Sequence, residues 1–178
     1  GPGADVPTLT VDDAGTVAEG NTAVFNMALD KAIDADTTMS FKIELGTAEA
    51  QDVGTPTVTI GGQTVQLTSD GQGNYSFTVP AGTTGGIAVS VPTTDDVVYE
   101  GEETFSINAT LTGTTASGTA INLTDTGAAT ITDEEGTGPG ADAPKLTVDD
   151  AGTVAEGNTA VFNMALDKAI DADTTMSF

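Results

Sequence analysis

The chain has 178 residues and carries 27 acidic side chains against four lysines, which gives a formal net charge of −23. The absence of Cys, His and Trp excludes disulfide bonds, thiolate metal sites and a histidine acting as general base. A chain this acidic does not attract nucleic acid or an anionic membrane surface, and no stretch approaches the ~20 apolar residues that span a bilayer. We therefore expect neither a nucleic-acid partner nor direct insertion into a membrane.

Alternation of apolar and polar residues predicts strands along most of the chain. Thr, which favours strands, occurs 33 times, and the 22 Gly residues favour turns between strands. The predicted strands are 8–11 with a continuation to residue 20, 22–29, 38–45, 57–60, 64–67, 74–79, 86–91, 104–111 and 128–132. Gly61-Gly62, between two of them, predicts a hairpin. No window has useful helical periodicity, so the sequence predicts an all-β fold, a two-sheet antiparallel Ig-like β-sandwich.

Nine strands is an odd number, and this decides the path of the chain. A chain that reverses direction at each strand enters the sandwich at one end and leaves it at the other. Such units in tandem extend end to end. A ten-residue strand spans roughly 33 Å, so each unit adds several nanometres of length.

An internal repeat is plain in the sequence. Residues 1–41 return as residues 138–178, and the two copies differ only at Val6/Ala143 and Thr8/Lys145. Identity this close predicts a tandem array of the same unit.

The repeat divides the chain into two predicted domains. Residues 1–137 form a complete β-sandwich repeat, and residues 138–178 are the first third of the next, near-identical repeat. Residues 134–140 are interpreted as the linker. The second copy is too short to bury a core alone, so it is either a truncated unit or a set of strands donated to a neighbouring domain.

The predicted strand directions gather acidic residues at the end where the chain leaves the sandwich. These residues are Glu19, Asp52, Asp95, Asp96, Glu100, Glu103, Asp133, Glu134 and Glu135. Carboxylates a few ångströms apart repel and destabilise a fold, and a divalent cation reverses the sign of that interaction. The other interpretation of part of this charge is ordinary solvated loops.

Calcium suits these residues better than other metals. Ca²⁺ takes about 6–8 oxygen ligands in flexible geometry, whereas Mg²⁺ keeps its waters and Zn²⁺ prefers nitrogen or sulfur. We predict Ca²⁺ as the cofactor, with more than one ion at this end.

The residues around these carboxylates resemble the Calx-β family. The resemblance covers most of residues 8–135 and is carried by Glu19-Gly20, Thr47-Ala48 leading to Asp52, Asp95-Asp96 followed by EGEETF at 100–105, and ATITDEE at 129–135. In that family such acidic positions coordinate calcium, so the resemblance implies this role for the nine residues named above.

Calx-β units occur as cytosolic calcium sensors and as tandem repeats of giant bacterial adhesins secreted by type I systems. Near-identical copies, few aromatic residues and extreme acidity resemble the second setting. The resemblance therefore implies an extender repeat of an RTX-type adhesin on the bacterial cell surface. Such a repeat projects a distal binding domain, is stiffened by Ca²⁺ at its junctions and has adjacent repeats as partners.

Three other functions compete with this one. Catalysis by paired carboxylates, as in glycoside hydrolysis, is not expected, because the few aromatic residues fall mostly on predicted core faces. Binding of a sugar or of ice would use flat strand faces that carry Thr55, Thr57 and Thr59. A surface filament would self-assemble by strand donation through residues 138–178.

The remaining acidic residues of the first copy are weaker candidates for ligands. Asp12 and Asp13 lie in a predicted kink before Glu19, and a contribution from them stays open. Asp30, Asp34 and Asp36 lie in a turn at the opposite end, and we interpret them as solvated turn residues.

Overall fold

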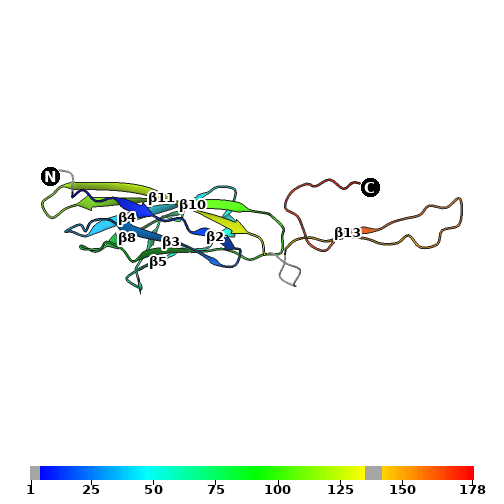
Figure 1. Cartoon of the computed structure of the whole chain (residues 1–178), viewed down its shortest axis with the longest axis horizontal. Coiled ribbons are helices and arrows are strands. Elements are labelled where there is room, and N and C mark those ends of the chain that lie inside the picture. The colour runs from blue at the N-terminus through cyan, green and yellow to red at the C-terminus, as the bar shows by residue number, and fades with distance from the viewer. Residues whose placement is uncertain (1–4, 135–141) are drawn as a thin grey trace. The chain divides into compact units, whose positions relative to one another are not determined.

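The computed structural model describes residues 5–134 and 142–178 (Figure 1). By compactness these form two units: a sandwich of residues 5–95 with 103–132, and a second unit of residues 96–102 with 133–134 and 142–178. The boundary predicted at residues 137–138 lies outside the described residues and stays a prediction. None of the helical segments in the described part is long and apolar enough to cross a membrane.

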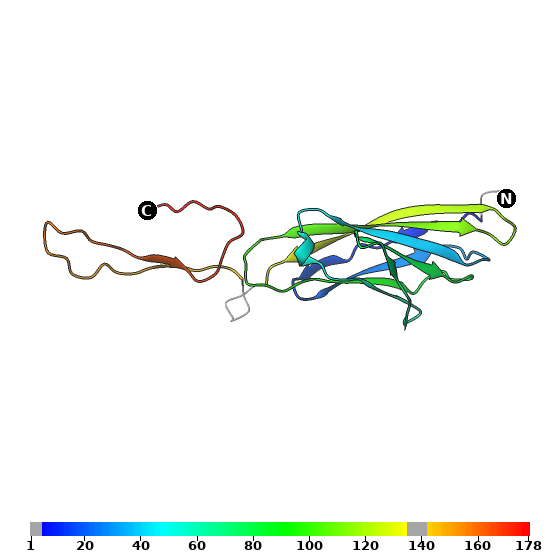
Figure 2. The ribbon, with the colours of Figure 1, turned by 180° about the vertical axis from the view of Figure 1, so that it is seen from behind.

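Two sheets make up the sandwich unit (Figures 1 and 2). The first has the order β1-β3-β9-β5-β6, and the second has the order β2-β11-β10-β4-β8-β7. The strands are β1 (Leu9–Val11), β2 (Gly15–Ala18), β3 (Thr22–Leu29), β4 (Thr37–Leu45), β5 (Thr57–Ile60), β6 (Gln63–Thr64), β7 (Thr68–Ser69), β8 (Asn74–Val79), β9 (Ile87–Pro92), β10 (Glu103–Thr114) and β11 (Ala120–Thr132). A single 3-10 turn, η1 (Ala50–Asp52), follows β4. The prediction of an all-β sandwich is confirmed.

The core lies between the two sheets and is built by every second residue of each long strand, as a period of two requires. In β3 the buried residues are Ala23, Phe25, Met27 and Leu29, and their neighbours face outward. Phe25 of one sheet meets Phe105 of the other edge to face, with ring centroids 5.9 Å apart. The sheets approach closely at Gly127, where an added Cβ would lie 2.9 Å from Phe25 Cδ1.

Strand pairing confirms the predicted path of the chain through the sandwich. β3 is antiparallel to β1 and β9, and β9 is antiparallel to β5. In the other sheet β10 is antiparallel to β4 and β11, and β4 is antiparallel to β8. Since β2, which continues β1, runs parallel to β11, the chain enters the sandwich at one end and leaves at the other.

The parallel pairing of β2 with β11 departs from the prediction of a wholly antiparallel sandwich. The first strand divides at a kink between β1 and β2, and its second half joins the opposite sheet beside β11. Two side chains hold this crossing: Asp125 Oδ2 accepts a hydrogen bond from Val11 N at 2.7 Å, and Asp13 Oδ1 accepts one from Ala128 N at 2.9 Å. Asp13, left open as a ligand, is therefore engaged with the backbone.

Two predicted strands have other bounds in the structure. The strand predicted at 64–67 is wrong, because the chain crosses there from β6 in one sheet to β7 in the other. The last strand, predicted at 128–132, begins at Ala120, and the apolar alternation in between is interrupted because Asp125 and Gly127 occupy inward positions. The predicted hairpin at Gly61-Gly62 is confirmed: both glycines have positive φ, and Ile60 pairs with Gln63.

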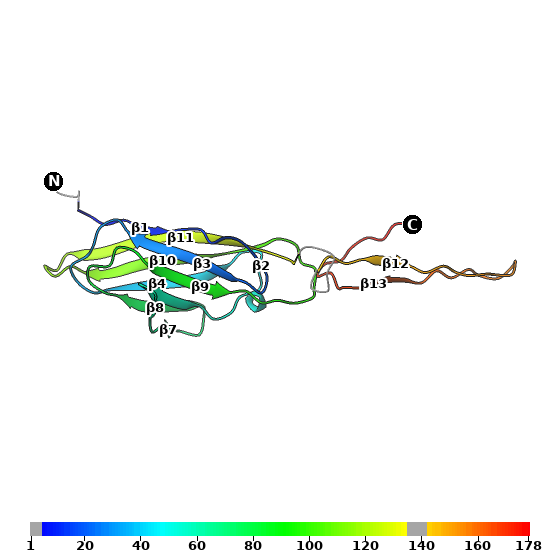
Figure 3. The same ribbon diagram turned by 60° about the horizontal axis from the view of Figure 1, so that its bottom comes forward.

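The second unit repeats the first two core strands of the sandwich. Its strands β12 (Leu146–Val148) and β13 (Met164–Leu166) run side by side as a narrow antiparallel ribbon (Figure 3). Leu146 pairs with Leu166 as Leu9 pairs with Leu29, so the register is that of the first copy at an offset of 137. The hydrogen bond next to the paired strands is the same in both copies: Lys145 N donates to Asp167 Oδ1 at 2.6 Å, as Thr8 N does to Asp30 Oδ1.

Burial is what differs between the two copies. Leu9 and Phe25 are 4% and 0% exposed in the sandwich. Their equivalents Leu146 and Phe162 are 49% and 58% exposed. The local hairpin therefore forms in both copies, and among the described residues only the first copy is part of a packed core.

Candidate functional site

Two buried carboxylates lie close together at the end of the sandwich where the chain leaves it. Asp52 closes η1, and its Oδ2 accepts a hydrogen bond of 2.5 Å from Glu49 N. Glu103 is the first residue of β10, and it faces inward at the start of that strand's buried alternation. A carboxylate oxygen of Asp52 lies within 4.8 Å of one of Glu103. The sequence predicted both residues as ligands, and the fold brings them together.

Glu19 and Asp95 lie at the same end of the sandwich. Glu19 is 5% exposed, and its backbone N donates to Thr132 O at 2.9 Å, beside the end of β11. Gly20, with φ of +81°, lets this turn approach Asp95, since a Cβ at that glycine would lie 3.0 Å from Asp95 Cβ. Asp95 itself is exposed.

Asp96 and Glu100 form a second carboxylate pair, in the other unit. One carboxylate oxygen of each lies within 4.8 Å of the other. Asp96 Oδ1 also accepts a hydrogen bond of 2.8 Å from Val98 N, which holds the turn between them. Both residues are half-buried.

Asp133 is the centre of a third group, also within the second unit. Its two carboxylate oxygens accept hydrogen bonds from Glu100 N at 3.0 Å and Gly101 N at 2.6 Å. Asp142 has a carboxylate oxygen within 4.8 Å of one of Asp133. Glu134, another predicted ligand, is half-buried beside them. Glu135, predicted with them, lies outside the described residues.

Asp142 was not predicted from the sequence. It is almost fully buried, and it is tied to Glu134 twice: its Oδ2 accepts from Glu134 N, and its own N donates to Glu134 O, each at 3.1 Å. Its equivalent in the first copy is Asp5, which is exposed. The internal repeat could have pointed to this residue, because Asp142 is the first acidic residue of the second copy after the linker.

The donor atoms of these groups fit a hard cation. They are carboxylate oxygens throughout, as Ca²⁺ prefers, and several are buried where like charges repel strongly. The two lysines of the sandwich pair elsewhere, Lys31 with Asp30 at 3.3 Å and Lys42 with Glu44 at 3.7 Å. A cation bound among these oxygens would offset the repulsion.

The acidic residues of the β3–β4 turn behave as the sequence predicted. Asp30, Asp34 and Asp36 lie at the opposite end of the sandwich, and each accepts a hydrogen bond from a backbone N–H of another segment. The hydrogen bond from Thr8 N, with help from Lys31, lowers the pKa of Asp30 below its usual value. These side chains hold loops together.

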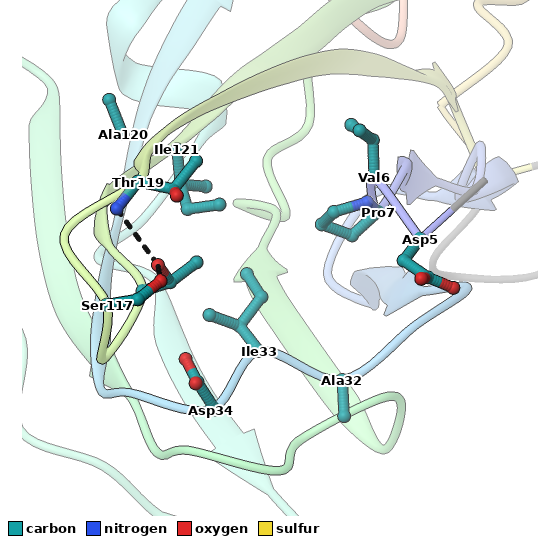
Figure 4. Close-up of a pocket in the computed structure, with 11 residues that line it drawn as sticks. Asp5, Val6, Pro7, Ala32, Ile33, Asp34, Ser117, Thr119, Ala120 and Ile121 are labelled. Carbon is teal, nitrogen blue, oxygen red and sulfur yellow. Dashed lines mark hydrogen bonds between the residues drawn. The ribbon is translucent and has the colours of Figure 1, made fainter. Parts of the chain in front are cut away.

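A pocket of about 470 Å³ opens at the end where the chain enters (Figure 4). Val6, Pro7, Ile33 and Ile121 give it a largely apolar lining. Thr119 N donates to Thr115 Oγ1 at 3.0 Å and shapes the β10–β11 turn at its rim. It shares no residue with the candidate ligands.

The strand order and registers define the class of this protein as a two-sheet β-sandwich. No protein-family model matches the chain, and no curated protein matches it. Its fold is similar to a non-cellulosomal cohesin from the hyperthermophilic archaeon Archaeoglobus fulgidus, with 9% identity over 73% of this chain and 92% of that one and a TM-score of 0.42. A chain from the crystal structure of a CaDoc–CaCohA2 complex is similar at 10% identity over 72% of this chain and 99% of that one, with a TM-score of 0.44.

Proposed function

We propose that this chain is a calcium-stabilised extender repeat of a bacterial cell-surface adhesin, similar to the Calx-β repeats of RTX-type adhesins. The observation that carries the proposal is the buried carboxylate pair Asp52 and Glu103, at the end where the chain leaves the sandwich. A buried pair of like charges costs free energy on folding, and a bound cation offsets that cost.

Calcium is the cation proposed for these carboxylates. In the sandwich the ligands are Glu19, Asp52, Asp95 and Glu103, and in the second unit they are Asp96, Glu100, Asp133, Glu134 and Asp142. A bound Ca²⁺ supplies positive charge and accepts several carboxylates at once in flexible geometry. Its role here is structural: it holds the turns that carry these residues in one arrangement.

Stabilisation follows from binding that favours the folded state. A ligand that binds only the folded chain stabilises it by about 2.7 kcal/mol per site at a 100-fold excess over its Kd. Typical domains are stable by about 5–15 kcal/mol. Calcium is therefore expected to contribute a large share of the repeat's stability in a medium that contains it.

Asp142 links the calcium proposal to extension. Within the second unit it joins the start of the second copy to Asp133, the last residue before the linker, and to Glu134, the first residue of the linker. A cation held by this group would fix the path of the chain where one repeat passes into the next. Since the chain enters and leaves the sandwich at opposite ends, repeats joined in this way project outward.

The setting is proposed from the sequence. Near-identical copies, the charge of −23 and the resemblance to Calx-β repeats favour an extracellular array whose partners are its own adjacent repeats. Binding of a sugar or of ice stays a prediction, resting on the outward Thr57 and Thr59 of the four-residue strand β5.

Calorimetric titration of the full chain tests the proposal. We expect Ca²⁺ to bind at more than one site with a Kd below about 1 mM, the weak end of extracellular calcium modules, and Mg²⁺ to bind far more weakly. Small-angle scattering with Ca²⁺ and with EDTA then reports the length, which we expect to be greater and better defined with Ca²⁺. Equal heats for Ca²⁺ and Mg²⁺, or no heat for either, would overturn the proposal.

A further inference from the structure

A turn that belongs to the first repeat by sequence is bonded to the second copy. Residues 96–102, which we call the Tyr99 turn, fold with the second unit. Tyr99 N donates a hydrogen bond to Ala169 O at 2.9 Å, and Asp171 N donates one to Tyr99 O at 3.2 Å. These two bonds make a parallel β-bridge between Tyr99 and Ile170.

We propose that the Tyr99 turn is the docking element between consecutive repeats, and that its partner is residues 169–171 of the following copy. The linker connects the two repeats covalently, and the bridge adds a second, non-covalent connection. Because the linker keeps the partners together, two hydrogen bonds form at a high effective concentration. The inference rests on the tandem array of the proposed function, and it does not depend on calcium.

The first copy shows that this docking is compatible with a complete repeat. The equivalent residues there are Ala32, Ile33 and Asp34, and all three line the pocket at the end where the chain enters. Ile33 is buried, and its O accepts a hydrogen bond from Gly82 N at 2.8 Å. Ala32 and Asp34 are exposed, and Ala32 O and Asp34 N bond to no residue within 5–134 and 142–178. The groups that the second copy offers to Tyr99 therefore stay accessible in a complete sandwich.

Each repeat carries both halves of the contact, at opposite ends. Glu103 directly follows the Tyr99 turn in the chain and lies at the end where the chain leaves the sandwich. Asp34, in the receiving segment, lies at the other end. A contact between two different surfaces of the same unit is head-to-tail and can continue along an array without closing. The partner of the Tyr99 turn is therefore another copy of the same repeat.

The Tyr99 turn is held in its docking conformation from both sides. Val98 N donates to Asp96 Oδ1 at 2.8 Å before Tyr99, and Glu100 N donates to Asp133 Oδ1 at 3.0 Å after it. A backbone fixed in this way loses less conformational entropy when it docks. Asp96 and Glu100 are also proposed calcium ligands, so a bound ion would fix the same turn further.

Hydrogen exchange of the full chain in EDTA tests the docking with an internal control. Residues 31–36 and 168–173 have the same sequence, KAIDAD, so the unprotected amides of Asp34 and Asp171 exchange at the same rate. Asp171 N donates to Tyr99 O, whereas Asp34 N has no partner in the described part of the chain. We expect Asp171 N to exchange at least about tenfold more slowly than Asp34 N. Equal exchange of the two amides would overturn the inference.

Disulfide trapping tests the bridge independently, because the chain has no cysteine of its own. Paired residues of neighbouring strands lie about 5 Å apart, within the Cα separation of about 4.4–6.8 Å that a disulfide spans. The Tyr99→Cys/Ile170→Cys chain should close its disulfide within one molecule at least about tenfold more readily than the Tyr99→Cys/Val161→Cys chain. Val161 is exposed and closer to Tyr99 in the sequence, so random collision favours the control. Equal closure in the two variants would overturn the docking.

Both measurements are made in EDTA and repeated with Ca²⁺, which separates this inference from the calcium proposal. Protection of Asp171 N and rapid disulfide closure in EDTA support the docking whether or not calcium binds. Calcium binding without either of these signals, in EDTA or in Ca²⁺, would leave the calcium proposal standing and overturn the docking.

Discussion

A carboxylate oxygen of Asp52 lies within 4.8 Å of a carboxylate oxygen of Glu103, although the two residues are 51 positions apart in the sequence. Asp52 ends the turn after β4, and Glu103 begins β10, its antiparallel neighbour in the sheet. Because the strands run in opposite directions, the end of one and the start of the other meet at the same end of the sandwich. This relationship is the basis of the calcium proposal.

Asp52→Asn should be at least as stable as the wild type in EDTA but less stable than the wild type in saturating Ca²⁺. Two like charges within 4.8 Å at an effective dielectric constant of about 20 repel by on the order of 3 kcal/mol. Removing one charge relieves that repulsion, so in EDTA the variant should be at least as stable as the wild type. With saturating Ca²⁺ it should be less stable by roughly 1–3 kcal/mol, measured by urea unfolding.

The matched control is Asp36→Asn at the opposite end of the sandwich. Asp36 is also an aspartate that accepts one backbone hydrogen bond, from Ala81 N at 2.8 Å. Its substitution should change stability equally with and without Ca²⁺. A calcium response of the same size in both variants would argue against a role for Asp52.

Asp142→Asn should weaken calcium binding in the second unit. Loss of a charged ligand is expected to reduce affinity at least about tenfold, the scale seen for indirect ligands of metals. Glu134 N donates a hydrogen bond to Asp142, and Asp142 N donates one to Glu134. Hydrogen exchange at these two amides therefore reports locally whether bound Ca²⁺ holds the pair together. Asp5→Asn, at the same position of the first copy, should leave the exchange unaltered, and protection lost equally in both variants would contradict the role given to Asp142.

Gly127→Ala should destabilise the sandwich by about 1–3 kcal/mol, the usual cost of overfilling a packed core. The new methyl group would lie 2.8 Å from Val11 Cγ1 and 2.9 Å from both Asp12 O and Phe25 Cδ1. Gly85→Ala is the comparison, since an added Cβ there meets no atom within 4 Å. Thermal unfolding should separate the two variants clearly, and equal melting temperatures would mean that the two sheets tolerate a wider spacing.

Asp30 gives the expected pH dependence. The hydrogen bond from Thr8 N, together with Lys31, lowers the pKa of Asp30 in the folded chain below the usual 3.8. A carboxyl group whose pKa is lowered by folding contributes stability above its unfolded pKa, and that contribution is lost as the pH falls through the folded pKa. Wild type and Asp30→Asn should therefore differ in urea unfolding at pH 6 and converge once the pH falls below the folded pKa, which lies under 3.8. A difference that persists at pH 2.5 would assign the effect to something other than this ionisation.

Much of the sandwich could be predicted from the alternation of apolar residues. β3, β4 and β8 lie within about one residue of their predicted bounds, because one face of each is buried and the other is solvated. The crossing from β6 to β7 was missed. A segment that passes from one sheet to the other keeps the same alternation of apolar and polar residues, so the pattern does not show that its neighbouring strand has changed.

The candidate ligands could be predicted as a group but not in their pairs. Strand direction alone assigned Asp52 and Glu103 to one end. The turn between Asp96 and Glu100, and the return of Asp142 to Asp133, depend on loop conformations that have no periodic pattern in the sequence. Asp142, which was not predicted, follows the linker in the sequence, and the linker hid its connection to Asp133 and Glu134.

Thermal unfolding of the full chain with EDTA, with Ca²⁺, and with Mg²⁺ or NaCl at equal ionic strength is the most direct test of the calcium proposal. The proposal predicts that Ca²⁺ raises the melting temperature of the sandwich by about ten degrees or more, since ~2.7 kcal/mol per site corresponds to several degrees for each ion. The salt controls should raise it far less. Equal shifts with Ca²⁺ and Mg²⁺ would show that the buried carboxylates are neutralised in another way and would contradict the proposal.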